Sequence, residues 1–368
     1  MSPKASAIRN FRLLETLQQY ARERLAKSGE AERIGRRHGE FFLALAEEAS
    51  PKLLGRDQQA WHDRLAGEIG NLRAALAWSG GEPETNLRLS NALTDFWYFH
   101  GLVQEGDGWF RTGLAGYATR NQLRARSLAH GARVSYWRDE FDDYSVRAHE
   151  ALDIYGELGD RAGTGRMLPR VGEAAEWRGD FKTAHESYDG AIAIAREVSD
   201  AGLFAHVLRL LGRLAMKEGD HHGARRYLEE SLSYFESVGQ QRPTNWALGY
   251  LGLNAIESGD LAAAQLYLEG ALTIARGLDF PIGVATPLMY FAALAAARSD
   301  PVRALHLAAA SESLGESAGA APVRLTKPVV ERWLDKSRRE LGPGRSAACA
   351  EKGRSLTRER AIEYALQG

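Results

Sequence analysis

The sequence has one cysteine, Cys349, among its 368 residues. A single thiol excludes an internal disulfide and a metal site built from several cysteines. The sequence also has no apolar run near the roughly 20 residues that a membrane-spanning helix needs, and its first residues lack the apolar core of a secretion signal. We therefore expect a cytoplasmic protein that makes no membrane contact.

Alternating, β-branched strand patterns are also lacking, whereas apolar residues recur at helical spacing. Trp61, Leu65, Ile69, Leu72 and Leu76 fall on one face of a helix. The composition, 44% hydrophobic and 26% charged, is that of a globular protein and excludes a disordered or collagen-like chain. The sequence predicts an all-α fold, and its length allows two domains or one elongated array.

The formal net charge of -1 hides two basic ends. Residues 1–37 carry nine Lys and Arg against four Asp and Glu, and residues 324–368 carry eleven against six. Basic patches can bind nucleic acid. Similar charges more often form the solvated faces of helices, so we favour that interpretation and keep nucleic-acid binding as an alternative.

A repeat of forty residues organises the middle of the chain. Three Gly-Asp pairs are each preceded by a glycine seven residues earlier and followed by an alanine five residues later. The repeat positions are Gly172, Gly179, Ala184, Gly212, Gly219, Ala224, Gly252, Gly259 and Ala264. The glycine of each pair suits the left-handed end of one helix, and the aspartate can cap the next helix. Each unit is therefore predicted to be a helical hairpin that must stack on its neighbours to bury its apolar stripe.

These positions resemble the tetratricopeptide repeat (TPR). Leu211-Gly212, Gly219-Asp220, Ala224 and Leu228 match the motif, and the next copy matches equally well. The usual TPR step is about 34 residues, so a step of forty implies longer helices or connections. The resemblance implies a right-handed TPR-like α-solenoid of stacked helical hairpins.

The two ends are similar to bacterial NB-ARC/STAND-type (LuxR-like) transcriptional regulators with TPR repeats. The segments 11–17 (Phe-Arg-Leu-Leu-Glu-Thr-Leu) and 71–76 (Asn-Leu-Arg-Ala-Ala-Leu) carry this likeness, and residues 349–366 resemble the closing helix of that family. The resemblance implies four parts: a winged-helix or helical-adaptor remnant (1–37), a helical linker (38–81), the TPR-like solenoid (82–320) and a C-terminal helical cap (321–368).

The ATPase and DNA-reading parts of such regulators are not visible in this sequence. No phosphate loop of the form Gly-x-x-x-x-Gly-Lys-Ser/Thr occurs, and the glycine-rich stretch 342–345 reads as a plain turn. His221-His222 lacks a nearby third ligand of the kind that a catalytic zinc needs. We expect no catalysis, no cofactor and no bound metal.

The family resemblance implies that the first helix of each hairpin lines a concave groove. The groove positions are Arg126, Arg133, Tyr136, Arg166, Glu173, Glu176, His206, Arg209, Arg213 and Trp246. Guanidinium groups suit carboxylates or phosphates, and Trp246 with Leu253 and Ile256 would form an adjoining apolar patch. The alternative is that these arginines face solvent and pair with Glu173 and Glu176.

The leading prediction is a non-catalytic protein- or ligand-binding TPR module, the sensor part of a bacterial transcriptional regulator. A protein or peptide segment, or a small effector, would bind in the groove. An ATPase or DNA-binding regulator would be its signalling partner. The first alternative is a free-standing scaffold that links two partners. The second is direct nucleic-acid binding through the basic ends, although DNA contact by this chain alone is not favoured.

Overall fold

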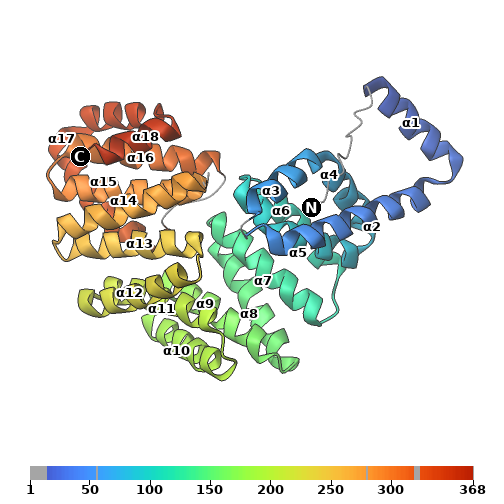
Figure 1. Cartoon of the computed structure of the whole chain (residues 1–368), viewed down its shortest axis with the longest axis horizontal. Helices are drawn as coiled ribbons and strands as arrows, with labels where there is room; N and C mark the ends of the chain where they lie inside the picture. The colour runs from blue at the N-terminus through green and yellow to red at the C-terminus, as the bar shows by residue number, and fades with distance from the viewer. Residues whose placement is uncertain (1–14, 55–56, 279–280, 319–323, 368) are drawn as a thin grey trace, which may run out of the picture.

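The computed structural model describes residues 15–54, 57–278, 281–318 and 324–367. Within these ranges the chain is helical and forms no strand, which confirms the all-α prediction (Figure 1). The array is preceded by α1 (Glu15–Ser28), α2 (Ala31–Ala49), α3 (Gln58–Gly67) and α4 (Ile69–Trp78). Residues 1–14 of the predicted winged-helix or adaptor segment lie outside the described residues.

Six helical hairpins follow in the described part of the chain. They are α5 (Pro83–Phe99) with α6 (Val103–Gly116), α7 (Gln122–Trp137) with α8 (Phe141–Glu157), α9 (Arg161–Trp177) with α10 (Phe181–Glu197), α11 (Ala201–Glu218) with α12 (His221–Ser237), α13 (Gln241–Glu257) with α14 (Leu261–Gly277), and α15 (Pro281–Ala297) with α16 (Pro301–Ser317). The TPR-like solenoid of stacked hairpins is thus confirmed.

In the three central hairpins, α9–α10, α11–α12 and α13–α14, the turn follows from a Gly-Asp pair. Gly219 has a φ of 86°, in the left-handed region that side chains other than glycine rarely adopt. The carboxylate of Asp220 accepts a hydrogen bond from the backbone N–H of Gly223 at 2.8 Å, and Asp180 and Asp260 cap α10 and α14 in the same way. The pair therefore ends one helix and starts the next within two residues.

The small residues of the repeat mark where the two helices of a hairpin cross. A Cβ atom added to the repeat glycine would lie 2.4–2.6 Å from a side chain of the second helix; the contacts are Gly172 with Tyr188, Gly212 with Leu228, and Gly252 with Leu268. Those three partners are fully buried, as are Ala184, Ala224 and Ala264. The forty-residue spacing thus reflects close helix crossing, repeated three times.

A C-terminal helical pair covers the last hairpin. It consists of α17 (Lys327–Arg354) and α18 (Arg358–Leu366), and both helices contact α15 and α16. The stretch 342–345, predicted as a turn, is a kink within α17, where Gly342 has a φ of 75°. None of the described helices combines the length and apolarity needed to cross a membrane.

The array curves until its first and last hairpins meet. Leu278 and Ile282, at the connection between α14 and α15, are buried in one apolar cluster with Trp97 and Tyr98 of α5. Ala318, just after α16, joins the same cluster. Figure 1 shows α13 and α15 on one side of the opening and α5 and α7 on the other, with α9 and α11 at the base. The first helices of the hairpins therefore surround a central space.

Candidate ligand-binding site

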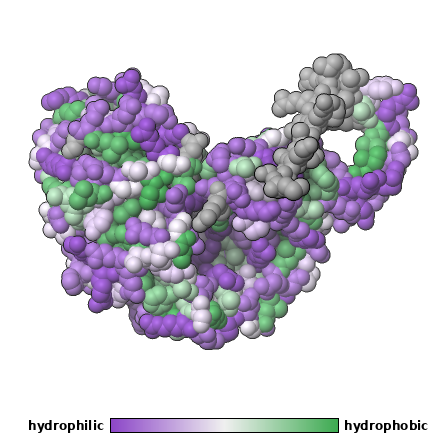
Figure 2. All heavy atoms as spheres, viewed as in Figure 1, coloured by the Kyte–Doolittle hydropathy of each residue, from purple (hydrophilic) through white to green (hydrophobic). Residues whose placement is uncertain are grey.

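The concave face encloses a cavity of about 890 Å³. Its wall is made mainly by α5, α7, α9, α11, α13 and α15, with the connection before α13 and residues 325–326 completing it. Figure 2 shows the surface hollowed between the hairpins at the two ends of the array. The volume lies in the range of sites that hold small molecules, about 300–1,000 Å³.

Charge on this wall is unevenly distributed. Four consecutive first helices each contribute one arginine: Arg133 (α7), Arg170 (α9), Arg209 (α11) and Arg242 (α13). Asp95 and Glu173 are the two carboxylates among the described lining residues. Because arginine stays protonated in proteins, the wall carries an excess of positive charge.

Asp95 and Arg133 form an ion pair on the α5–α7 side. The guanidinium nitrogen of Arg133 lies 2.7 Å from a carboxylate oxygen of Asp95, and the same guanidinium lies over the ring of Trp137. Burial raises the pKa of Asp95, but the attraction of Arg133, His130 and Arg242 outweighs it and leaves that pKa below its ordinary value. Asp95 is thus ionised and neutralised by Arg133.

Glu173 belongs to a buried polar cluster beneath the pocket. Arg213, which is 0% exposed, places its guanidinium 3.3 Å from Glu173 and 2.7 Å from Glu176. Lys217 adds a contact to Glu176 at 3.2 Å, and the hydroxyl of Tyr188 donates to the same carboxylate at 3.0 Å. Two cations and two carboxylates therefore balance in this floor cluster, which we define as Glu173, Glu176, Arg213 and Lys217.

Arg209 has quite different surroundings. Its side chain is 5% exposed and donates to the Nδ1 atom of His206 at 3.0 Å. The guanidinium lies over the rings of Trp246 and Tyr250, at 5.4 and 5.7 Å from their centroids. Burial, then the charges of Arg209 and Arg170, hold the pKa of His206 well below its ordinary value. His206 is thus neutral and can accept that hydrogen bond.

Arg170 is a second guanidinium on the wall that forms no ion pair with a carboxylate among the described residues. Its Nη1 atom donates to the backbone oxygen of Arg166 at 3.2 Å. The Nε atoms of Arg170 and Arg209 are both buried, and neither finds a hydrogen-bond acceptor among the described residues. Burial lowers the pKa of Arg170 from its ordinary value.

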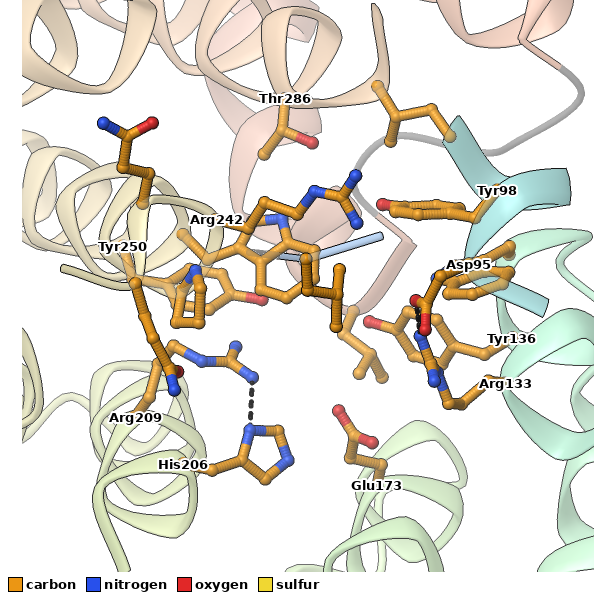
Figure 3. A pocket seen from close by; sticks show the side chains of 18 of the residues that line it. Asp95, Tyr98, Arg133, Tyr136, Glu173, His206, Arg209, Arg242, Tyr250 and Thr286 are labelled. Carbon is orange, nitrogen blue, oxygen red and sulfur yellow. Dashed lines mark hydrogen bonds and ion pairs between the residues drawn. The ribbon is translucent and has the colours of Figure 1, made fainter. Parts of the chain in front are cut away.

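Arg242 bridges the two ends of the array. Its backbone belongs to α13, and its guanidinium lies 6.0 and 5.5 Å from the ring centroids of Tyr98 and Phe99 on α5. Figure 3 shows Arg209 and Arg242 entering the pocket from α11 and α13, with Asp95, Tyr98 and Arg133 on the facing wall. The cavity is therefore lined by both ends of the solenoid.

The structure brings together six of the ten predicted groove residues: Arg133, Tyr136, Glu173, His206, Arg209 and Trp246. Arg126 and Arg166 are exposed and do not line the cavity. Glu176 and Arg213 are buried in the floor cluster, because α9 and α11 press together there. Leu253 and Ile256 are core residues, so they do not form the expected patch beside Trp246.

Several lining residues were missed by the sequence analysis, chiefly Asp95, Tyr98, Arg170 and Arg242. A usable signal existed for part of this set. Arg170, Tyr250 and Tyr290 each stand nine residues before the positive-φ residue that ends their helix, and all three line the pocket. Long polar or aromatic side chains recurring at one offset indicate a shared surface even when their types differ.

The histidine pair considered for metal binding has other contacts. The ring of His221 lies 3.1 Å from the amide oxygen of Asn254. Across the described ranges, no group of three or more His, Cys, Asp or Glu side chains is arranged to hold a metal ion.

No protein-family model matches the sequence. The chain is 35% identical over 173 residues to predicted HTH-type transcriptional regulators of Mycobacterium tuberculosis and Mycobacterium bovis. The match covers 44% of this chain and 19% of each relative, so the chain spans about a fifth of the length of the curated relatives that it matches.

Among solved structures, the chain is similar to the Rap conjugation gene regulator of plasmid pLS20 in complex with the Phr* peptide. The TM-score is 0.53 at 12% identity, over 86% of this chain and 96% of that one. A STAND protein with a TPR sensor from Pyrococcus horikoshii gives a TM-score of 0.46 at 15% identity, over 84% of this chain and 55% of that one. At such identities, the likeness to the Rap regulator shows the fold alone.

Proposed function

We propose that this chain is the non-catalytic sensor module of a bacterial transcriptional regulator, and that a peptide segment or small effector binds in the concave pocket. The observation that carries the proposal is the enclosure of one cavity by both ends of the solenoid. Arg242 of α13 reaches the rings of Tyr98 and Phe99 on α5. An occupant that binds differently to open and closed arrays would shift the balance between them.

The partial match to HTH-type regulators supports the regulatory role. Their unmatched length would supply DNA binding, with this module controlling it. The Rap regulator, whose structure holds a peptide, supports a peptide as one type of occupant. The same proposal includes the division of the chain into an adaptor (1–37), a helical linker (38–81), the solenoid (82–320) and a C-terminal cap (321–368).

The alternatives fit the described contacts less well. A scaffold needs surface for two partners, whereas the charged and aromatic residues described above converge on one cavity. At the basic C-terminal end, Arg332 pairs with Glu257, Arg338 with Glu331 and Asp335, and Arg358 with Glu359. Such pairing leaves less free positive charge for a nucleic-acid backbone.

The proposal is tested in the native host with two matched alleles. Trp246→Ala removes an aromatic side chain from the pocket wall. Leu266→Ala is the control, because Leu266 is 69% exposed on the outer helix α14. Native mass spectrometry of the purified chain should show a bound mass in wild type and Leu266→Ala that Trp246→Ala has lost. Transcription of the controlled genes should change only in the Trp246→Ala strain.

Equal protein levels in the three strains, measured by immunoblot, separate loss of binding from loss of the protein. The same bound mass in all three, or unchanged transcription in the Trp246→Ala strain, would contradict a sensor role for this pocket.

A further inference from the structure

The pocket wall holds two guanidinium groups, that of the buried Arg209 and that of the half-buried Arg170, which its own carboxylates do not neutralise. Glu173 is held from below by Arg213 at 3.3 Å, and Asp95 is held by Arg133 at 2.7 Å. Arg170 and Arg209 form no ion pair within the described ranges. Their positive charge therefore faces the cavity without compensation.

The hydrogen-bond donors of these two arginines are also incomplete. Arg209 is 5% exposed, and its Nε atom has no acceptor among the described residues; the same holds for Nε of Arg170. A buried charged donor without an acceptor destabilises the fold. A planar guanidinium matches carboxylate and phosphate oxygens, which accept two parallel hydrogen bonds. An oxyanion would thus supply both the missing charge and the missing acceptors.

Aromatic side chains form part of the remaining lining of the pocket. Trp246 and Tyr250 flank the Arg209 guanidinium, and Tyr136 and Tyr290 also line the cavity. About 890 Å³ is far more than one inorganic ion fills, and rings of this kind stack against flat or apolar bodies. The cavity therefore suits an acidic group carried on an aromatic or apolar body.

We propose that the pocket binds a small oxyanion ligand of this kind, with a phosphate or carboxylate group held by Arg170 and Arg209 and an aromatic body against Trp246 and Tyr250. This inference rests on the proposed function and specifies the class of effector. The neutral side chain of His206 keeps Arg209 in place by accepting its Nη2 hydrogen bond at 3.0 Å.

The test uses isothermal titration calorimetry of the full chain with three matched compounds: 1-naphthyl phosphate, 1-naphthoate and 1-naphthol. We expect at least one of the two anions to bind at a single site and 1-naphthol to bind at least tenfold more weakly. The stronger anion identifies the acidic group, because the three compounds share one ring system. Raising the salt concentration should weaken the anions more than the neutral compound.

Variants then assign the binding to these residues. Arg170→Gln and Arg209→Gln should each weaken the favoured anion at least tenfold and leave 1-naphthol within twofold. The matched control is Arg225→Gln on the outer helix α12, where Arg225 is exposed and pairs with Glu229 at 2.7 Å; its affinity should equal that of wild type. Circular dichroism and the thermal midpoint establish that each variant is folded.

Three results would overturn the inference: no saturation by either anion up to millimolar concentration, 1-naphthol binding as tightly as the anions, or unchanged affinity in both arginine variants. Trp246→Ala separates this failure from failure of the sensor proposal. If neutral and anionic compounds bind equally and both are lost in Trp246→Ala, the oxyanion proposal is wrong and the pocket is still a binding site. If the anion binds through Arg209 but Trp246→Ala does not change transcription, the oxyanion proposal stands and the sensor proposal is wrong.

Discussion

Arg209 and Arg213 stand one turn apart on α11 and have opposite surroundings. Arg213 is fully buried between two carboxylates of α9, whereas Arg209 lies against His206 and an aromatic wall. Carboxylate attraction outweighs burial and raises the pKa of Arg213, while desolvation and the nearby arginines lower that of His206. The charges of the floor cluster balance, and the cluster stabilises the fold. The pocket wall has an excess of positive charge that can bind an anion. Four predicted effects, from the largest to the smallest, test this contrast.

Removing Arg213 should have the largest effect. Arg213→Met keeps much of the volume but leaves Glu173 and Glu176 buried with Lys217 as their remaining cation. Breaking a buried ion pair from one side lowers the free energy of unfolding by about 3–5 kcal/mol. Urea denaturation monitored by circular dichroism measures this loss in the free energy of unfolding.

The companion variant carries Arg213→Met together with Glu173→Gln, so that Glu176 and Lys217 remain as one ion pair at 3.2 Å. Because one cation and one carboxylate are then left in the floor cluster, most of the lost stability should return. A loss below about 1 kcal/mol in the single variant would mean that the floor cluster contributes no more than a surface pair.

The second effect concerns the hydrogen bonds of the floor cluster. Tyr188→Phe removes the donor that lies 3.0 Å from Glu176, and hydrogen bonds to buried charged groups contribute about 1.5–3 kcal/mol. Tyr267→Phe is the matched control, because its contact to Glu229 is exposed and 3.5 Å long. Urea denaturation should show a loss in the first variant and less than about 0.5 kcal/mol in the second. Equal losses would show that the cluster does not depend on this donor.

The third effect is on pH dependence and probes the pocket wall. The pKa of His206 is lowered in the fold by burial and nearby arginines, so below pH 6.5 the unfolded chain takes up a proton that the folded chain does not. The contribution of His206 to the free energy of unfolding is therefore fully present above pH 6.5 and is lost as the pH falls below it. His206→Asn, whose amide oxygen can still accept from Arg209, should reduce this slope by up to about 1.4 kcal/mol per pH unit.

The slope should not vanish in that variant. Burial also lowers the pKa of His62 to about 4 and that of His130 to about 3, so both act in the same direction. Urea denaturation between pH 7 and 5 gives the slopes. An identical slope in wild type and His206→Asn would mean that His206 titrates normally and that its surroundings are not cationic.

The floor and the pocket differ in how far sequence could predict them. Gly219 and Asp220 specify a helix end and a helix start by local chemistry, so the hairpins and their forty-residue step follow from the sequence. Arg209 and Arg213 are the same residue type on neighbouring turns. Which of them meets carboxylates depends on how α9 packs against α11, a contact between residues forty apart. Counting positions along one sequence cannot predict this packing. The count therefore placed both arginines in the groove.

Closure of the array was beyond the sequence for a related reason. Arg242 and Tyr98 are separated by more than a hundred residues and meet because a small rotation at each hairpin accumulates over the stack. The repeat pattern fixes neighbours and does not fix the summed curvature. Asp95 and Tyr98, which precede the clear repeats, therefore gave no signal as pocket residues.

The smallest effect on stability should come from Arg209 itself. Arg209→Gln removes a buried cation that has no carboxylate partner among the described residues, and it also removes the contacts with Trp246 and Tyr250, worth about 0.5–1 kcal/mol. Relief of the desolvated charge should slightly exceed that loss, so we expect a gain of up to about 1 kcal/mol by urea denaturation. A loss of more than 1 kcal/mol would make Arg209 a structural residue like Arg213, and the contrast between floor and pocket would no longer hold.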